Sequence, residues 1–591
     1  MTAAIATCIH EYLLQENITD YKTTLFKEAT SFYSKPIFYL YSMDISGIQD
    51  FIYTITSKGA LKGLRSRSFY LEIMMEHLID SLLEKLFLSR VNLIYSGGGH
   101  AYILLPNTEK VRKIVGDFER EVNEWFLEMF ETQIYIAGGG AVCSASDFWN
   151  EPEGSYREIF RNISKEISFK KLHRYSPKQI IKLNHSGMPY GERECSVCHR
   201  HNYLKDGETE CEICWALKQM SGNILKGDFF TVTSKKEKTC LPLSGNCYLV
   251  TDTESTLRKR MKEDKYYIRS YSKNKPYSGY YVSTKLWVGD YVNGETFEEL
   301  GQRATGIERI AVMRADVDNL GQAFVRGFEN EKNGSKYVTL SRTATFSRKL
   351  SMFFKYHINS LLKEGGYSIL EEEAQMEKED DRRNALIVYS GGDDIFIVGA
   401  WDDIIGFAVD LHDNLMEYSQ DTLKISAGIG IYPSKYPISI MARETGRLEE
   451  AAKSVEGKNA VALFDEKYTF PWEEFIENVV EEKLYFIQKY FKVVDEKGKN
   501  FLYNLLELVR KRKEDKINIA RFAYLLGRME PKVQRGAKKE EIEEKRDLHR
   551  EFSRKMYEWI RVEKDAKELE MAIYLYVYTK REKEEHDGVN E

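Results

Sequence analysis

The pattern of apolar and polar positions is clearest at residues 385–398, where two apolar runs flank Gly391, Gly392, Asp393 and Asp394. Apolar β-formers on both sides of a Gly-Gly pair are typical of a β-hairpin. We therefore predict a hairpin with the glycines at its tip and the two carboxylates just past the bend. Adjacent carboxylates repel each other unless a cation lies between them. The plainer alternative is a tight turn with solvated aspartates.

A second apolar run, residues 310–315, ends at Asp316 and is followed by a helical pattern. With the hairpin and a later strand at 425–431, it gives the ferredoxin-like order of strand, helix, hairpin, helix and strand. The first strand and the hairpin are neighbours in such a sheet, so Asp316 is expected to face Asp393 and Asp394. Three carboxylates suit two divalent cations about 3.5–4 Å apart, the arrangement for in-line attack on a phosphate.

Three further polar residues lie near these strands in the sequence. Asp318 is a second metal ligand or a helix cap, and its place before a helical pattern favours the cap. Lys453 lies near the end of a short helical pattern, and Lys458 lies in the turn after it. Each lysine is a candidate to hold a triphosphate, with a solvated surface lysine as the alternative.

The same pattern occurs earlier in the chain. An apolar run ends at Asp44, a helical pattern extends to Leu86, and residues 94–100 read Ile-Tyr-Ser-Gly-Gly-Gly-His. Strand, helix and hairpin recur in the same order, which indicates an internal duplication. Where the later copy has its acidic pair, this one has Gly99 and His100. We expect the first copy to offer a glycine-rich surface for phosphate or base, without chemistry of its own.

Composition narrows the class of protein. The 591 residues are 42% hydrophobic and 30% charged, as in a soluble globular protein of about four domains. The sequence has no apolar run of membrane-spanning length and no signal segment at Met1, so we predict a cytoplasmic protein without membrane contact. With a net charge of −6, any nucleic acid is expected to be held by local basic patches or by partner subunits.

Four of the eight cysteines form two C-x-x-C pairs twelve residues apart. This spacing matches a tetrahedral four-thiolate zinc site, with Zn–S distances of about 2.3 Å. The pattern predicts a structural zinc ion, and the alternative is four reduced surface thiols. His199 and His201 are interpreted as solvated neighbours. The predicted ligands are Cys195, Cys198, Cys211 and Cys214.

The remaining stretches carry weaker patterns. Residues 150–290 lack a clear period apart from a helical piece at 156–171, and residues 370–383 form a charge run typical of a solvated loop. The sequence after Pro471 is largely helical and predicts a bundle for packing and subunit contact. Its i, i+3, i+4, i+7 spacing is seen at Leu502, Leu505, Leu506 and Val509.

Three features together resemble one family. The segment Asp44-Ile-Ser-Gly-Ile-Gln-Asp-Phe-Ile52, the four-cysteine insert and Tyr389-Ser-Gly-Gly-Asp-Asp394 are similar to the large signature subunit of type III-A (Csm-type) CRISPR effector complexes. The resemblance covers essentially the whole chain. It implies an α+β fold of two ferredoxin-like palm domains, a zinc-bearing insert and a C-terminal helical bundle. The implied parts are a helical connector (1–35), first palm (36–150), insert (151–300), second palm (301–470) and helical domain (471–591).

The resemblance also implies a function. Complexes of this family are guided by a CRISPR RNA to a foreign transcript, and the large subunit then converts ATP into cyclic oligoadenylates with Mg²⁺ or Mn²⁺. The implied partners are ATP, CRISPR RNA and target RNA through the complex, and other subunits, notably the small subunit and the 5′-handle-binding subunit. Family members usually carry an N-terminal HD nuclease domain. This sequence shows no suitable His-Asp pair, since His586 and Asp587 lie in a polar tail, so we expect no DNase activity from it.

The resemblance and the residues together suggest roles at the two hairpins. Asp316, Asp393 and Asp394 would hold two metal ions and carry catalysis at the second palm. A second ATP would lie at the first palm. The expected nucleotide-binding residues are Ser46, Gly97, Gly98, Ser390, Gly391, Gly392 and Lys453.

Three other functions share part of this pattern. A free-standing dinucleotide cyclase has the same hairpin but pairs two separate chains. A template-dependent polymerase needs a basic duplex channel, which a net charge of −6 does not favour. A non-catalytic RNA-binding scaffold predicts that losing Asp393 and Asp394 changes only local stability.

Overall fold

The computed structural model describes the chain apart from several short segments. These are residues 56–59, 186–193, 201–203, 206, 330–331, 333, 377–381, 495–499, 532–538 and 582–591. His201, the His586–Asp587 pair and part of the predicted charged loop therefore lie outside the described residues. Among the helices that are described, none is both long and apolar enough to span a bilayer.

The first copy of the repeat folds into a four-stranded antiparallel sheet of order β2-β3-β1-β4. Helices α3 and α4 connect β1 to β2, and α5 connects β3 to β4, which is the ferredoxin-like order. Helix α6 packs on β4. The bounds are β1 Phe38–Ser46, α3 Ile48–Tyr53, α4 Ala60–Lys85, η2 Arg90–Asn92, β2 Leu93–Gly97, β3 His100–Pro106, α5 Glu109–Phe130, β4 Tyr135–Cys143, η3 Asp147–Trp149 and α6 Ser155–Leu172.

The second copy is built the same way and extended at one edge, with strand order β12-β13-β11-β14-β15-β16. Central strand β11 is buried almost throughout, as expected from its apolar run. Its register places Asp316 opposite Asp394. The bounds are β11 Ile310–Val317, α11 Leu320–Arg326, α12 Leu340–Met352, η4 Phe353–His357, α13 Ile358–Glu364, α14 Glu372–Met376, β12 Ala385–Ser390, β13 Asp394–Ala400, α15 Trp401–Ser419, β14 Ile425–Tyr432, α16 Ile438–Lys453, β15 Ala460–Leu463 and β16 Thr469–Pro471.

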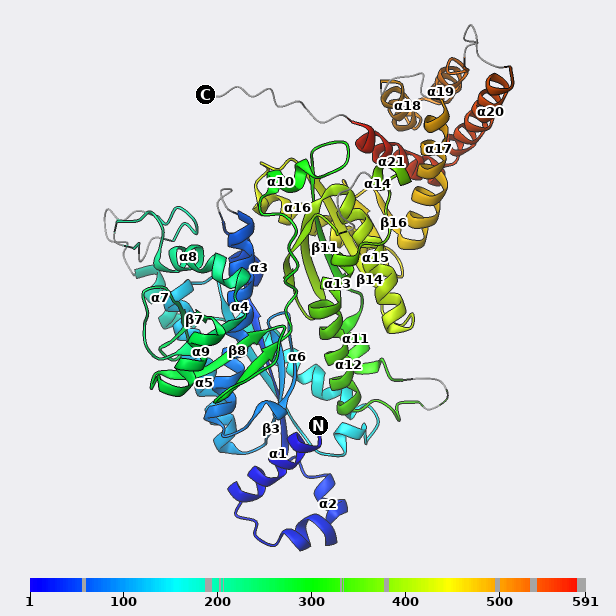
Figure 1. Cartoon of the computed structure of the whole chain (residues 1–591). Coiled ribbons are helices and arrows are strands. Elements are labelled where there is room, and N and C mark those ends of the chain that lie inside the picture. The colour runs from blue at the N-terminus through cyan, green and yellow to red at the C-terminus, as the bar shows by residue number, and fades with distance from the viewer. Residues whose placement is uncertain are drawn as a thin grey trace.

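Between the two copies lies a third sheet, of order β6-β7-β5-β8-β10-β9, which the sequence pattern did not predict. Its strands are short and mix tyrosine, serine and lysine, so they show no clean alternation. In Figure 1 this part packs beside α4. The bounds are α7 Pro177–His185, α8 Glu212–Lys226, β5 Phe229–Thr233, β6 Leu241–Leu243, β7 Cys247–Asp252, α9 Glu254–Glu263, β8 Tyr267–Lys273, β9 Tyr277–Ser278, β10 Val282–Leu286 and α10 Phe297–Gln302.

Both ends of the chain are helical. The N-terminal helices lie beside β3, and the C-terminal helices extend from the second copy (Figure 1). The mixed α+β fold with palm-like units and a helical domain, as predicted, is confirmed. The bounds are α1 Thr2–Gln15, η1 Thr23–Lys27, α2 Ala29–Tyr33, η5 Glu474–Leu484, α17 Tyr485–Val493, α18 Asn500–Lys511, α19 Ile517–Gly527, α20 Lys539–Arg561 and α21 Glu563–Lys580.

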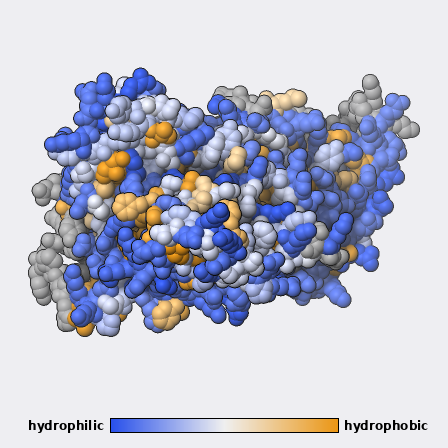
Figure 2. Space-filling view, turned by 90° about the horizontal axis from the view of Figure 1, so that it is seen from below, coloured by the Kyte–Doolittle hydropathy of each residue, from blue (hydrophilic) through white to orange (hydrophobic). Residues whose placement is uncertain are grey.

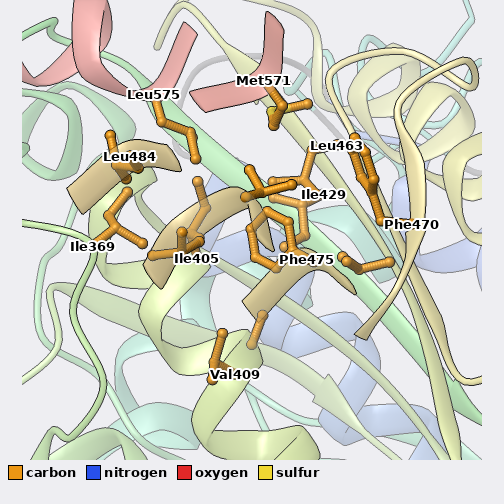
Figure 3. Close-up of a cluster of buried hydrophobic side chains, with 14 of the residues drawn as sticks. Ile369, Ile405, Val409, Ile429, Leu463, Phe470, Phe475, Leu484, Met571 and Leu575 are labelled. Atoms are coloured by element: carbon orange, nitrogen blue, oxygen red, sulfur yellow. The ribbon is translucent and has the colours of Figure 1, made fainter. Parts of the chain in front are cut away.

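The C-terminal helices share a hydrophobic core with the second copy (Figure 3). Side chains from α15, β14, β15 and β16 meet side chains from η5 and α21, and burying each contributes about 1.5–3 kcal/mol. This shared core fixes the helical domain against the second sheet. The labelled members are Ile369, Ile405, Val409, Ile429, Leu463, Phe470, Phe475, Leu484, Met571 and Leu575. The outer surface in Figure 2 is mostly hydrophilic, with hydrophobic residues in small groups.

Candidate active site

The glycine hairpins of the two copies meet tip to tip. A Cβ added to Gly97 would lie 3.0 Å from the Cα of Gly392, and one added to Gly392 would lie 3.4 Å from the Cα of Gly97. A Cβ on Gly98 would lie 3.5 Å from Oδ1 of Asp393. The first hairpin therefore lies directly over the carboxylates of the second, and glycine permits the close approach.

Three carboxylates line this meeting point. Asp316 comes from the end of β11, and the backbone amide of Val317 donates to the carbonyl of Asp393 at 3.1 Å. Burial and the charge of Asp316 raise the pKa of Asp393 to about 6. Burial and the charge of Asp393 raise the pKa of Asp394 to about 7. Burial also raises the pKa of Asp316. The site thus holds more negative charge than its neighbours balance.

A lysine partly offsets that charge. Nζ of Lys453, at the end of α16, lies 2.8 Å from Oδ2 of Asp316 and 2.6 Å from Oε1 of Glu449. Lys458 lies on the surface and donates to Oδ1 of Asn319 at 2.9 Å. The structure therefore brings Lys453 to the carboxylates and leaves Lys458 beside the turn. The contact of Glu449 with Lys453 was not predicted. Its only signal in the sequence is the spacing of four residues between them.

Other predicted residues are placed differently. The Ser390 hydroxyl donates to the carbonyl of Phe354 in η4, so it is already used within the second palm. The prediction that Asp318 caps the following helix is wrong, because the N-cap residue of α11 is Asn319. Oδ2 of Asp318 instead accepts from the hydroxyl of Ser426 and the backbone amide of Asn459, both at 2.9 Å. Asp318 therefore ties β11 to β14 and to the turn before β15.

The first copy has a matching but altered site. Asp44 and His100 face each other in the register that Asp316 and Asp394 have in the second copy. Nζ of Lys171, near the end of α6, lies 2.6 Å from Oδ2 of Asp44. Burial works against ionisation of Asp44, but hydrogen bonds and charges of His100 and Lys171 lower its pKa. The buried Ser46 hydroxyl has no hydrogen-bond partner in the described part of the chain.

The four paired cysteines converge on one point. All four are buried, and their sulfur atoms lie within 4.8 Å of one another. Nη2 of Arg67 lies 3.0 Å from Sγ of Cys214, and Nε of Arg200 lies 3.2 Å from Sγ of Cys198. Within the described residues, this is the one group of three or more potential metal ligands so close together.

Comparisons with known proteins agree with this architecture. Residues 37–186 match the family of Csm1 subunit domain B, and residues 309–462 match the Cas10/Cmr2 second palm domain. Residues 488–582 match the second helical domain of the Cmr2 subunit of the CRISPR RNA silencing complex. A single-strand-specific deoxyribonuclease Cas10/Csm1 (subtype III-A) from Mycobacterium tuberculosis is 45% identical over 99% of this chain and 72% of its own length. The chain belongs to the Cas10/Csm1 family of subtype III-A.

Other members and solved structures extend the comparison. The Cas10/Csm1 protein of Streptococcus thermophilus is 41% identical over 98% of this chain and 73% of its own length. The structure of a Csm1–Csm4 subcomplex superposes with a TM-score of 0.70 at 24% identity, covering 98% of this chain and 74% of that one. A Csm1–Csm4 cassette in complex with cA4 gives 0.68 at 23%, with 98% and 73% coverage. These structures show that the fold is shared.

Proposed function

We propose that this Cas10/Csm1 chain, as the large subunit of a type III-A effector complex, makes cyclic oligoadenylates from ATP at its second palm. The observation that carries the proposal is the meeting of two glycine hairpins over Asp316, Asp393 and Asp394. Two glycine-rich surfaces facing one acidic centre are what the joining of two nucleotides requires. Structural relatives of the same fold were solved with one ATP and with cA4.

The carboxylates fit divalent metal ions. Oxygen ligands suit Mg²⁺ or Mn²⁺. Burial and the neighbouring carboxylates raise the pKa values of Asp393 and Asp394, and a bound cation would offset both effects. Metal ions held by Asp316, Asp393 and Asp394 would supply activation of a ribose hydroxyl and charge for the leaving pyrophosphate.

The remaining residues bind and orient the nucleotides. Gly391 and Gly392 leave room for phosphates at the second hairpin, and Lys453 neutralises phosphate charge once Asp316 has another cation. Ser46, Gly97 and Gly98 offer the matching surface for a second ATP at the first palm. The buried Ser46 hydroxyl, which has no partner among the described residues, would donate to that nucleotide. Asp44 is held by Lys171, so the first palm binds without catalysing.

The four-cysteine cluster fits a structural zinc ion. Zn²⁺ with four thiolates carries a net charge of about −2, which is costly to bury without cations nearby. Arg67 and Arg200 are buried guanidinium groups that donate to the sulfur atoms, and they balance that charge. All four thiolates are used, so no open position is left for chemistry. The ion would fix the insert to α4, which carries Arg67.

We assign the partners by family. CRISPR RNA and target RNA would reach this chain through the complex, whose other subunits include the small subunit and the 5′-handle-binding subunit. A relative of the same fold was solved with Csm4. The expected absence of DNase activity stays a prediction, since the relatives carry that activity in their names and the chain spans 72% of the first one's length.

A product assay on the assembled complex tests the proposal. With ATP, Mg²⁺ and target RNA, wild type should release cyclic adenylates detectable by mass spectrometry, and Asp393→Ala/Asp394→Ala should release none. Asp117→Ala/Glu121→Ala, on the exposed face of α5, is the matched control and should act like wild type. An unchanged yield from the Asp393→Ala/Asp394→Ala complex, or no product from wild type, would leave an RNA-binding scaffold. A linear or cyclic dinucleotide made without target RNA would indicate a free-standing cyclase.

A further inference from the structure

Exposed tyrosines gather at one end of the insert sheet, where α9 ends and β8 and β10 begin. Tyr280, Tyr281 and Val282 are 67%, 51% and 75% exposed. Val282 is the first residue of β10, and the two tyrosines lie directly before it. Tyr266, at the start of β8, is also exposed. We call Tyr266, Tyr267, Tyr280 and Tyr281 the tyrosine patch. Large exposed aromatic groups of this kind mark a binding surface.

The rings of the tyrosine patch are held in place by one another. The rings of Tyr267 and Tyr281 are nearly parallel, 8° apart in plane, with centroids 5.8 Å apart. Tyr280 meets Tyr281 edge to face at 5.0 Å. Tyr267 is partly buried against the small core beneath α9, so it anchors the row. A row anchored in this way offers flat faces to a ligand at little cost in conformational entropy.

The surroundings of the tyrosine patch are strongly basic in an acidic chain. Residues 254–285 contain nine Lys or Arg and three Asp or Glu, while the whole chain has a net charge of −6. Nζ of Lys265 lies 5.0 Å from the centre of the Tyr266 ring, and Nζ of Lys235 lies 5.7 Å from it. Lys cations beside aromatic faces attract both phosphate and base.

The acidic residues of this segment are largely occupied. Glu254 pairs with Arg258 at 2.9 Å, and Asp264 pairs with Arg260 at 3.4 Å. Glu263 is exposed on the last turn of α9. Of the basic residues that remain, Lys259, Lys262 and Lys265 have no ion pair in the described part of the chain. Lys285 has none there either, and its Nζ lies 3.4 Å from the centre of the Trp287 ring. Their charge is therefore available to an anionic partner.

We propose that the tyrosine patch binds a single-stranded RNA segment. Unpaired bases would stack on Tyr280 and Tyr281, and Lys262 and Lys265 would contact phosphates, the combination typical of single-strand recognition. A protein partner fits less well because lysine is depleted in protein interfaces. A duplex fits less well because its bases are not available for stacking. This surface is separate from the palms, and the inference does not depend on the proposed synthesis.

Fluorescence anisotropy of the purified full chain with labelled rU20 tests the proposal. Tyr280→Ala/Tyr281→Ala should weaken binding about tenfold or more, since stacking on an aromatic residue contributes about fivefold or more per base and two rings are removed. Tyr280→Phe/Tyr281→Phe keeps the rings and should bind within about twofold of wild type. Tyr33→Ala, another exposed tyrosine, is the matched control and should change nothing. Circular dichroism would verify that every variant is folded.

Salt and strand type give independent readouts. Lys262→Ala/Lys265→Ala should reduce the slope of log affinity against log salt by about 1.4, the value for two phosphate contacts to a single strand. A 20-base-pair duplex should compete weakly. Equal affinity of the Tyr280→Ala/Tyr281→Ala chain and wild type for rU20 would overturn the proposal. The same variants are also measured with the single-stranded DNA dT20. A loss of affinity for dT20 but not for rU20 would overturn the proposal, and so would wild-type binding as tight to the duplex as to rU20.

Discussion

At the scale of single residues, Lys453 pairs with Asp316, one of the carboxylates of the proposed metal site. Its ammonium group bridges Asp316 and Glu449 when no other cation is bound. A phosphate chain arriving with metal ions at Asp316 would compete for the same ammonium group. Lys453 is therefore placed to move from carboxylate to phosphate as the site fills.

Replacing this lysine tests the assignment. Lys453→Ala should lower the rate of cyclic oligoadenylate formation by the assembled complex by about 100-fold, the usual cost of losing a charge-stabilising group. Lys458→Ala removes a lysine whose one hydrogen bond among the described residues is to Asn319, and it should change the rate less than about threefold. Mass-spectrometric time courses give both rates. Similar losses of rate in Lys453→Ala and Lys458→Ala would contradict a special role for the lysine beside the carboxylates.

Arg67 is the second single residue whose role can be tested, and it contacts the cysteine cluster. Its guanidinium group donates to Cys214 at 3.0 Å and to the carbonyl of Phe51 at 3.1 Å, so it links the cluster to α3. Arg67→Met removes a buried cation and should speed zinc transfer to a chromophoric chelator about 10-fold or more. Lys62→Met, at an exposed position on the same helix, is the control. Equal transfer rates would mean that Arg67 does not balance the cluster.

At the scale of elements, η5 and α21 are joined by a buried ion pair. Nζ of Lys483 lies 2.6 Å from Oε2 of Glu568, and the side chains are 1% and 0% exposed. Glu568→Ala leaves Lys483 buried without its closest partner and should lower the free energy of unfolding of the helical domain by about 3–5 kcal/mol. Denaturant titration measures the change. Glu563→Ala, which breaks a fully exposed pair with Lys513, should leave the transition where it is.

The sequence predicts some elements well and others not at all. The two hairpins and the strands before them are found because apolar runs, glycine pairs and carboxylates coincide there. The insert sheet is missed because its strands are short and because β5 carries a register shift between Val232 and Thr233. Lys171 is missed because it follows the first hairpin by about seventy residues and reaches Asp44 only through the packing of α6 on β4.

At the scale of the whole molecule, the duplication produces one composite site from two unequal units. The first palm keeps an aspartate and a lysine, Asp44 and Lys171, at places matching Asp316 and Lys453. It has His100 where the second palm has Asp394. The two hairpins touch at Gly97 and Gly392, so the site exists only while the palms stay together.

A partly buried ion pair joins the two palms. Nζ of Lys355, in η4 of the second palm, lies 2.6 Å from Oε1 of Glu72, in α4 of the first. Burial works against the charge of Lys355, but Glu72 and Glu76 raise its pKa, so it stays ionised at neutral pH. This contact crosses the palm interface and lines the same cavity as Gly97, Gly98 and Gly391.

Breaking that pair tests whether the composite site needs a fixed palm interface. Lys355→Met should lower cyclic oligoadenylate formation at least tenfold, because misplacing reacting groups by about 1 Å costs up to 100-fold. Glu72→Gln/Lys355→Met removes both charges and should recover part of the loss, since no unpaired charge then remains buried. Wild-type rates in Lys355→Met would show that the hairpin contact alone sets the geometry. If the double variant forms cyclic oligoadenylates no faster than Lys355→Met, the uncharged pair cannot maintain the geometry of the palm interface.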